Sequence, residues 1–427
     1  MPDNVGLTYP VWFAYGIGHV LNDLCSSIWF SYTLLFFEFV LEFDNTLAGA
    51  TIIIGQVADG ISAPIVGILS DKKFESWFCK YGRRKTWHLI VLFQFGWCCT
   101  QVSHLSLGPE LSPDQHDRTS LISLRYSFTV LSNIIVYVIF FAVLHLKKKE
   151  KDDILGPQDK SKFQLLAWIV IFIGLIMSAI FHIVIKEKPV TFDDNEQICE
   201  TNVHFKSLIR NFKIYNVACV YITSRLFVNL SQVYIPYYLQ TYLQLLSKNL
   251  AIFPLVMFIS SFITSIIIKQ FNVEFGRRFT YVFGSVVGIL ACIWLHFGQE
   301  DDVYFRTYEI YGIVIAFGCA SAVILVTSVG ITTDLIGNNT NNGAFVYGIM
   351  SFGDKVANGI VVFIIQNLKI PNYKPYYRDA LTISCSIVII IGMITVLTVK
   401  SLESPYYSNV LLEEEEDKTT EEERNCS

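Results

Sequence analysis

The sequence predicts an all-α protein that crosses a membrane many times, and three observations support this fold class. Hydrophobic residues make up 52% of the 427 residues. Charged residues make up only 16%, well below the roughly 25% that is usual in soluble domains. The mean hydropathy is +0.45, and the apolar residues are gathered into long stretches. These stretches reach the length of about 20 residues that a helix needs to cross a bilayer.

Eleven such stretches follow one another, and we expect each to form one membrane-spanning helix. A lipid-embedded backbone must satisfy its own hydrogen bonds, which a helix does within one segment. The stretches lack the short length and alternating polarity of barrel strands. They are Val11–Phe37, Leu47–Leu69, Trp87–Leu107, Tyr126–Leu146, Phe163–Ile185, Ile214–Tyr242, Leu250–Ile268, Phe279–Gly298, Ile310–Thr332, Gly343–Asn367 and Ala380–Val399.

A polar segment near the middle and an internal repeat divide the chain into two helical halves. Gly82-Arg83-Arg84 follows the second stretch of the first half, and Gly276-Arg277-Arg278 follows the second stretch of the second half. We therefore expect a bundle of five spans, a linker, a bundle of six spans and an acidic, solvated tail. The corresponding residues are 1–186, 187–213, 214–400 and 401–427.

The repeat also indicates that the first half has one span fewer than the second. The interval from Gly82 to Pro109-Glu110-Leu111 is shorter than that from Gly276 to Thr333-Asp334-Leu335. The difference is about 30 residues, or roughly one membrane helix with a loop. We interpret the 11 spans as an original 12 that lacks a helix between Ile90 and Val91, through either an exon-skipped isoform or a defective gene sequence.

Polar and ionisable side chains lie inside several predicted spans, where each charge costs about 3 kcal/mol and marks a functional candidate. Residues three or four apart share a helix face, as His19 and Asp23 do, and Gln56 and Asp59. A third helix carries a polar stripe of Arg225, Asn229 and Gln232, and a fourth carries Asp354, Lys355 and Asn358. Polar stripes on four helices predict a water-filled central cavity. The alternative is a buried ion-pair network that only fixes the packing of the helices. The candidate substrate- or ion-binding residues are Asp23, Asp59, Gln101, Arg125, Arg225, Asn229, Asp354 and Lys355.

Two further sets of residues lie outside the spans. The first set lies in and around the two Gly-Arg-Arg loops. We interpret it as a clasp that holds one conformation closed, with simple positive-inside charge as the alternative. Tyr407 and Val410 fit a Tyr-x-x-Φ sorting pattern, which is short and unspecific. The clasp candidates are Asp71, Gly82, Arg83, Arg84, Gly276, Arg277 and Arg278.

Several classes of protein are disfavoured by the sequence. It contains no HExxH, GxSxG or Walker pattern, so we expect no enzyme and no cofactor. No basic block with interleaved aromatic residues suggests nucleic acid as a partner. No metal site is expected, and most of the ten cysteines lie in apolar stretches, which is typical of small core residues rather than a disulfide framework.

The loop that runs from Gly67 through Asp71 to Gly82-Arg83-Arg84-Lys85 resembles the loop signature of the major facilitator superfamily. Its long spacing is similar to that of the glycoside–pentoside–hexuronide cation symporter branch, typified by melibiose permease. Longer matches resemble one subgroup of that branch. They include Tyr15–Cys25, Gly55–Gly60, Phe93–Trp97, Gln101–Leu107, Leu124–Val130, Arg225–Gln232, Asp334–Gly337 and Gly343–Gly359.

This resemblance implies a two-bundle alternating-access carrier in the membrane of lysosomes and melanosomes that imports cysteine. We expect a monomer embedded in lipid that binds cysteine or a similar zwitterion, with protons as the candidate coupling ion. Asp23, Asp59 and Lys355 match charged positions of the cation symporters. Two positions that are acidic in that branch are occupied here by Ala63 and Gln101. Their lack of carboxylates disfavours a sodium site built from several oxygens.

Within this reading, Asp59 and Asp23 pair with Lys355 across the bundle interface until substrate or a proton releases them. Arg225 holds a substrate carboxylate, and Asp23 supplies the anion for the substrate ammonium. Two alternatives remain: a sugar:cation symporter, and a non-transporting truncated isoform that acts as a scaffold or inhibitor of the full-length carrier.

Overall fold

The computed structural model describes residues 8–71, 96–97, 99–101, 104, 107, 111, 115–146, 155–186, 212–336 and 343–398. Every regular element in these ranges is helical, which confirms the predicted all-α class. Ten of the eleven predicted stretches coincide with described helices. The remaining stretch, Trp87–Leu107, and the proposed junction at Ile90 and Val91 lie largely outside the described residues.

The first predicted stretch is one broken helix rather than a straight span. The break falls at Gly18 and His19, where a Cβ on Gly18 would collide with the rings of Phe181 and His104. Two π-helical turns continue the segment, a local geometry that is often found at functional sites. The described elements of the first half are α1 (Tyr9–Ile17), α2 (Val20–Ile28), η1 (Trp29–Thr33), η2 (Phe36–Val40), α3 (Asn45–Asp71), α5 (Gln115–Leu146), η5 (Pro157–Asp159) and α6 (Lys160–Val184).

In the second half, two element boundaries follow directly from residue type. Pro236 lies inside the end of its helix, and the chain passes into a π-helical turn two residues later, as expected where proline removes a backbone donor. Gly276 has a φ of 77°, which favours glycine and separates two helices. The elements are α8 (Phe212–Tyr237), η6 (Tyr238–Tyr242), α9 (Asn249–Phe275), α10 (Arg277–Phe297), η7 (Phe305–Glu309), α11 (Ile310–Ile336), α12 (Gly343–Asn367) and α13 (Tyr376–Thr398).

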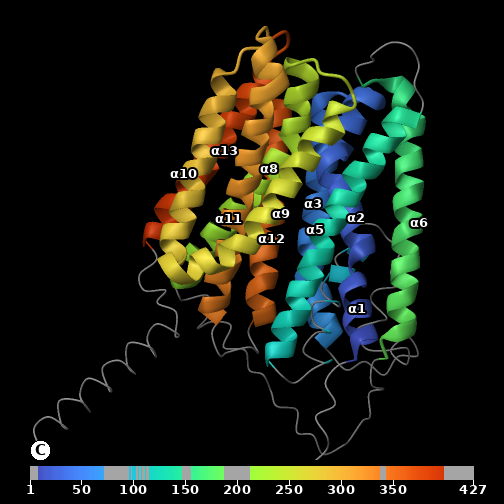
Figure 1. Cartoon of the computed structure of the whole chain (residues 1–427), viewed down its shortest axis with the longest axis vertical. Coiled ribbons are helices and arrows are strands. Elements are labelled where there is room, and N and C mark those ends of the chain that lie inside the picture. Colours follow the sequence, from blue (N-terminus) through green and yellow to red (C-terminus); the bar gives the residue numbers. More distant parts are fainter. Residues whose placement is uncertain are drawn as a thin grey trace, which may run out of the picture.

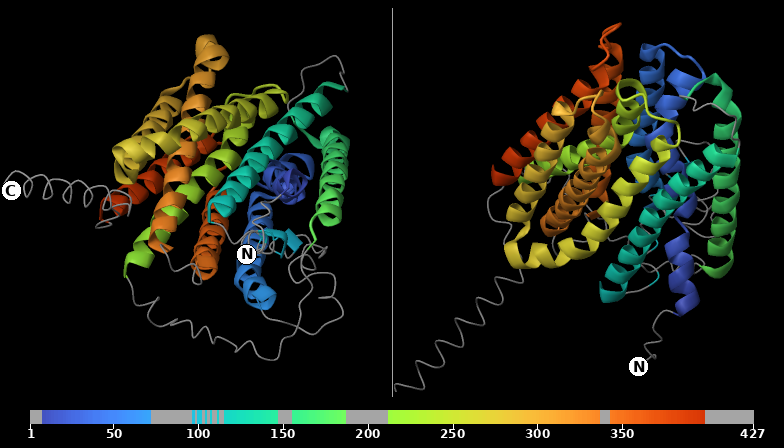
Figure 2. Two further views of the ribbon diagram at one scale, coloured as in Figure 1. Left: turned by 60° about the horizontal axis from the view of Figure 1, so that its bottom comes forward. Right: turned by 45° about the horizontal axis from the view of Figure 1, so that its top comes forward.

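The helices form two groups that stand side by side (Figures 1 and 2). In the first group, α1 and α2 pack on α5 and α6; in the second, α8 to α13 pack on one another. The groups meet where α3 lies along α12 and α5 lies against α9. Residues that face this junction from α3 and α12 can therefore contact side chains of the other half.

Long apolar faces on the outer helices are consistent with a lipid surround. Trp168, Phe172 and Ile183 of α6 are 70%, 67% and 74% exposed, which would be unfavourable in water over so large an area. Among the described residues, seven helices are individually long and apolar enough to cross a membrane. They contain Ser127–Leu144, Pro157–Val184, Asn249–Ile268, Arg277–Phe297, Phe305–Thr332, Ile349–Asn367 and Tyr376–Thr398.

Glycines allow α3 and α12 to approach closely, as small residues do at helix contacts in membranes. A Cβ on Gly359 of α12 would lie 3.1 Å from the Cβ of Gln56 on α3. Towards the other end of the contact, a Cβ on Gly49 would lie 2.9 Å from the Cβ of Gln366. The two helices therefore run antiparallel in close contact, which brings the polar residues in their middle together.

Candidate functional site

The middle of the α3–α12 contact holds an ion pair between the two halves. Asp59 of α3 accepts a hydrogen bond from Lys355 Nζ of α12, and both residues are buried. Lys355 Nζ also lies 5.8 Å from the centroid of the Trp97 ring. Because a charge buried at this depth needs a partner, the pair ties the two halves together in this conformation.

A second ion pair lies beside the first, within the second half. Arg225 Nε on α8 donates to Asp354 Oδ2 on α12 at 3.2 Å, and Asn229 Nδ2 lies 3.5 Å from Asp354 Oδ1. The Asp354 side chain is 4% exposed, whereas that of Arg225 is 32% exposed. Adjacent residues on a helix point about 100° apart, so Asp354 and Lys355 each pair with a different neighbouring helix rather than with each other.

Asp23 belongs to a separate polar cluster inside the first half. His19 Nδ1 lies 2.9 Å from Asp23 Oδ1, and Thr129 Oγ1 of α5 donates to Asp23 Oδ2 at 2.9 Å. Arg125 Nη2 of α5 lies 3.0 Å from His19 Nε2, and Asn22 Nδ2 lies at the same distance from that atom. Since a guanidinium only donates, Nε2 must accept, and the proton of a neutral His19 resides on Nδ1.

This placement separates residues that the sequence interpretation grouped together. Asp59 pairs with Lys355 as expected, but the hypothesis that Asp23 also pairs with Lys355 does not match the structure. Both oxygens of Asp23 are engaged, one by His19 on the preceding turn and the other by Thr129 of α5. Gln101 is half-buried.

The polar stripe of α8 continues to a third contact between the halves. Gln232 Nε2 donates to Ser31 Oγ on η1 at 3.0 Å and to Tyr137 Oη on α5 at 3.2 Å. Ser31 Oγ and Tyr137 Oη are 2.6 Å apart. The spacing of Arg225, Asn229 and Gln232 predicted a polar face. At one end of this face Gln232 bonds the first half, and at the other end Arg225 and Asn229 contact Asp354 of α12.

Two buried residues that were outside the candidate set flank the Asp59–Lys355 pair. Gln56 is one turn before Asp59 on α3, and Asn358 is one turn after Lys355 on α12. Their exposures are 2% and 1%. The spacing of three residues placed both on the charged faces, but the predicted Asp59–Lys355 pair did not by itself show that these two amides would flank it. We call Gln56, Asp59, Lys355, Asn358 and the pair Arg225–Asp354 the central cluster.

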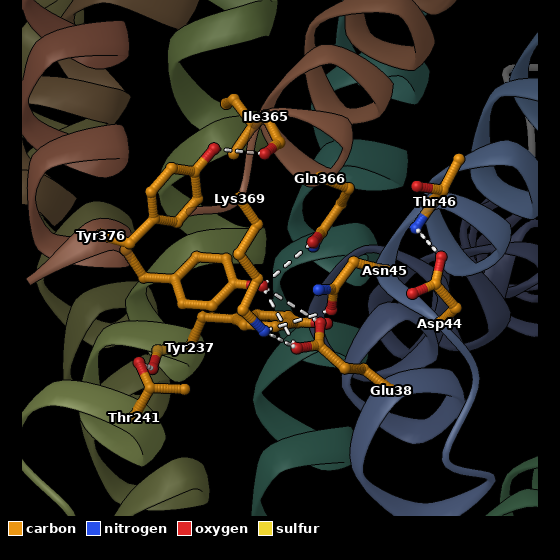
Figure 3. A network of polar contacts seen from close by, with 11 residues as sticks. Glu38, Asp44, Asn45, Thr46, Tyr237, Thr241, Ile365, Gln366, Lys369 and Tyr376 are labelled. Atoms are coloured by element: carbon orange, nitrogen blue, oxygen red, sulfur yellow. Dashed lines mark hydrogen bonds and ion pairs between the residues drawn. The ribbon is translucent and has the colours of Figure 1, made fainter. Parts of the chain in front are cut away.

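A different polar network joins the halves near one end of the bundle (Figure 3). Lys369 Nζ, just beyond α12, donates to Glu38 Oε1 on η2 at 2.6 Å and to Asn45 Oδ1 at 3.2 Å. Tyr377 Oη lies 3.2 Å from both oxygens of Glu38, to which its hydroxyl can donate, and 3.0 Å from Gln366 Oε1. We call these five residues the Glu38 network. The sequence interpretation missed it because Glu38 lies just past the first predicted span.

The clasp candidates are only partly within the described residues. Gly276 forms the turn into α10, and Arg277 packs against Gly330 of α11 so closely that a Cβ on Gly330 would collide with its guanidinium. Arg278 lies in the first turn of α10. Asp71 ends α3, but its side chain is outside the description. Gly82, Arg83, Arg84, Tyr407 and Val410 lie outside the described residues.

The arrangement suits a carrier of small polar molecules. It combines two helical groups, exposed apolar outer faces, and acidic and basic side chains paired at the buried junction. Within the described ranges, no group of three or more His, Cys, Asp and Glu side chains is placed to hold a metal ion. The fold and site thus define a polytopic membrane transporter of the two-bundle class.

Comparison with known proteins identifies the family of transporters to which the chain belongs. Residues 87–399 match the family model described as MFS/sugar transport protein. The chain belongs to this family of the major facilitator superfamily. The two-bundle fold and the family resemblance seen in the sequence are therefore confirmed.

Individual relatives agree with the family, and solved structures agree with the fold. The chain is 37% identical to human major facilitator superfamily domain-containing protein 12 over 409 residues, covering 83% of this chain and 84% of that protein. It is 38% identical to the mouse protein of the same name over 408 residues, with the same coverage. The nucleoside transporter NupG has a similar fold, with a TM-score of 0.64 at 14% identity, covering 92% of this chain and all of NupG (100%). A D-xylose-proton symporter gives a TM-score of 0.64 at 12% identity, covering 92% and 97%.

Proposed function

We propose that this transporter is an alternating-access carrier that imports cysteine into lysosomes and melanosome-like organelles. The two rocking bodies are residues 1–186 and 214–400, joined by the linker 187–213, and the carrier works as a monomer. The cysteine substrate and the organelle come from the sequence resemblance. The observation that carries the transport mechanism is the Asp59–Lys355 ion pair, because it joins the two bodies at the buried junction.

A charge pair at this junction can act as a switch between two states. While Asp59 and Lys355 hold each other, the halves are tied together along α3 and α12. A zwitterion carries one ammonium and one carboxylate, so it can replace each partner of such a pair by the matching charge. Binding of the substrate then breaks the Asp59–Lys355 ion pair. The two halves can now rotate relative to each other about the site, as in other carriers built from two repeats.

Proton coupling has a structural candidate in the cluster around His19. His19 Nε2 accepts from Arg125, so a proton on that nitrogen and the Arg125 contact exclude each other. Protonation would change the net charge of His19, Asp23 and Arg125 from zero to +1. The expelled Arg125 would then be available to a carboxylate, which links proton binding to substrate binding.

The test is accumulation of labelled cysteine by intact lysosomes from cells that lack the endogenous carrier, with this chain re-expressed at a verified organelle level. Accumulation above the empty-vector control supports the proposal. Absence of accumulation by correctly localised protein, repeated with purified chain in liposomes, contradicts transport of cysteine by this form. The scaffold or inhibitor alternative predicts that second result together with reduced uptake when the full-length carrier is present.

A sugar:cation symporter is the runner-up within the transporters, and the family description names sugar transport. The central cluster contains two acid–base pairs, Asp59–Lys355 and Arg225–Asp354, which suits a zwitterion better than a neutral sugar. The liposome assay separates the two, since an excess of unlabelled hexose or pentose would compete for a sugar site and leave a cysteine site unaffected.

A further inference from the structure

Three buried side chains at the α3–α12 contact keep polar atoms without a partner in the described part of the chain. These atoms are Gln56 Oε1, Asp59 Oδ1, and both Oδ1 and Nδ2 of Asn358. Gln56, Asp59 and Asn358 are 2%, 2% and 1% exposed. Leaving a buried donor or acceptor unpaired costs about 1–3 kcal/mol, so three such residues together call for a ligand.

Helix register brings these three residues to one place. Asp59 contacts Lys355 directly, and a Cβ on Gly60 would lie 3.6 Å from the Cβ of Lys355. One turn further on each helix, a Cβ on Gly359 would lie 3.1 Å from the Cβ of Gln56. Gln56 and Asp59 share a face of α3, and Asn358 immediately precedes Gly359 at the point where α12 meets that face.

Asn358 also lies between the two ion pairs of the central cluster. At about 100° per residue, its direction on α12 falls between that of Asp354, which faces α8, and that of Lys355, which faces α3. The Asn358 amide is thus placed to contact a ligand that reaches from the Asp59 side to the Arg225 side. Its free Nδ2 donor and Oδ1 acceptor suit a ligand with both a donor and an acceptor.

The unpartnered atoms match a primary ammonium group. Three oxygens, on Asp59, Gln56 and Asn358, can accept the three N–H bonds of one R–NH₃⁺, and the Asp59 carboxylate supplies the opposite charge. The other oxygen of Asp59 already binds an ammonium, that of Lys355. By contrast, both oxygens of Asp23 are engaged, which leaves Asp59 as the better anion for a substrate.

We propose that Gln56, Asp59 and Asn358 form the subsite that binds the ammonium group of the transported amino acid, with Asn358 Nδ2 donating to the substrate carboxylate. This assignment rests on the proposed function, which names a zwitterionic substrate, and it replaces Asp23 by Asp59 as the ammonium partner. Gln56 and Asn358 then determine specificity for a free amino group.

The test measures how two half-substrates compete with labelled cysteine in liposomes that contain the full chain. Cysteamine carries the ammonium without the carboxylate, and 3-mercaptopropionate carries the carboxylate without the ammonium. In Gln56→Leu, the inhibition constant of cysteamine should rise about tenfold, equivalent to one lost charge-assisted hydrogen bond, while that of 3-mercaptopropionate changes by less than about twofold.

Asn358→Asp should give the opposite pattern, because it keeps the acceptor and removes the donor. Cysteamine should bind as tightly as to the wild type or more tightly, and 3-mercaptopropionate should bind more weakly. Gln240→Leu is the matched control: Gln240 is a buried glutamine on η6 that donates to the Leu155 carbonyl, and its loss should affect the two competitors equally or not at all.

Three outcomes overturn the subsite: unchanged cysteamine competition in Gln56→Leu, equal weakening of both competitors in that variant, or a sodium requirement of wild-type uptake that Gln56→Leu alone removes. The last outcome would assign the oxygens to a sodium ion. Failure of the proposed function is recognised separately, since wild-type protein would then not take up cysteine. In that case, thermal stabilisation of the purified wild type by cysteamine, and its loss in Gln56→Leu, still decides the subsite.

Discussion

Two carboxylates of the first half, Asp59 and Glu38, each reach across the junction to a lysine of the second half. Glu38 has both oxygens engaged, by Lys369 and Tyr377. Asp59 has one oxygen on Lys355 and the other without a partner among the described residues. The same type of ion pair is therefore saturated in one place and open to a ligand in the other.

The positions of the two pairs fit this difference. Lys369 lies roughly 20 Å further along the axis of α12 than Lys355, at about 1.5 Å per residue. Its side chain is 29% exposed, whereas that of Lys355 is 10% exposed. Lys369 Nζ also lies 5.1 Å from the Tyr377 ring centroid, so aromatic and polar groups complete its surroundings. We expect the Glu38 network to hold one end of the junction closed, and the central cluster to bind what is transported.

The largest effect is expected at the open carboxylate. Asp59→Asn removes the negative charge that pairs with Lys355 and, in the proposed subsite, with the substrate ammonium, and it leaves Lys355 a buried cation without its counter-ion. Cysteine accumulation should fall by about tenfold or more, since loss of about 1.4 kcal/mol of binding is already tenfold. The measurement is labelled uptake normalised to protein in the organelle membrane, and unchanged accumulation would refute the role.

A smaller, kinetic effect is expected at the saturated carboxylate. Glu38→Gln keeps the shape and some hydrogen bonds but removes the ion pair with Lys369 at one end of the junction. Uptake should change by about two- to fivefold, as for the loss of one partly exposed ion pair of about 1 kcal/mol or less. Cysteine affinity at equilibrium should stay as in the wild type.

The Glu38→Lys and Lys369→Glu double variant sharpens this prediction. If the contact acts as an ion pair between the halves, the reversed pair should recover most of the uptake that either single reversal loses. Equal loss in the single and double variants would show that the Glu38 network does not act through its charges.

The pH dependence of uptake should depend on His19 rather than on the central cluster. The titratable or charged groups around His19 are Asp23 on its own helix, Arg125 from α5, and His104, whose ring centroid lies 5.5 Å away with Tyr15 stacked on it. Acidification should favour the protonated His19 that releases Arg125, so wild-type uptake should rise as the pH falls.

His19→Gln cannot take up this proton and should flatten the pH profile while leaving uptake near the wild-type value at neutral pH. The measurement is initial uptake rate over a series of pH values on the entry side, with His296→Gln as a control far from the cluster. A His19→Gln profile parallel to the wild-type profile would exclude the proton role.

The smallest effect concerns the packing of α3 against α12, near the central cluster and near the Glu38 network. Gly359→Ala places a Cβ 3.2 Å from the backbone Cα of Ile53, and Gly49→Ala places one 2.9 Å from the Cβ of Gln366. Each should destabilise the folded chain by about 1–3 kcal/mol through overpacking. Thermal unfolding in detergent should show similar losses for both, but only Gly359→Ala should also weaken cysteine binding, since it displaces Gln56.

The fold could be predicted from the sequence largely because the bilayer imposes one signal on every span: length and apolarity. The break at Gly18 and His19 escaped that signal, because apolarity alone does not show that Phe181 from a distant helix packs closely against Gly18. Intramembrane charges such as Asp59 and Lys355 were found by rarity alone. Their partners were not all predictable, because periodicity gives the face of a helix but not the helix that it meets.

The same limit explains the residues that were missed. Asn358 and Gln56 shared faces with predicted charges, yet only the α3–α12 register shows that they meet and remain unpartnered. Glu38 and Lys369 lie beyond the ends of apolar stretches, where a charge is ordinary and carries no signal. For Asp23 the predicted burial was correct but the predicted partner was wrong, because its carboxylate bonds His19 one turn away on the same helix.

The most direct test of the central claim is the thermal shift that cysteine induces in purified chain, compared between Asp59→Asn and Glu38→Gln. Ligand that binds the folded state raises the unfolding temperature by mass action. Our account predicts a shift in the wild type and in Glu38→Gln, and its loss in Asp59→Asn. A shift that persists in Asp59→Asn, or that disappears in Glu38→Gln, would contradict the assignment of ligand binding to the central cluster.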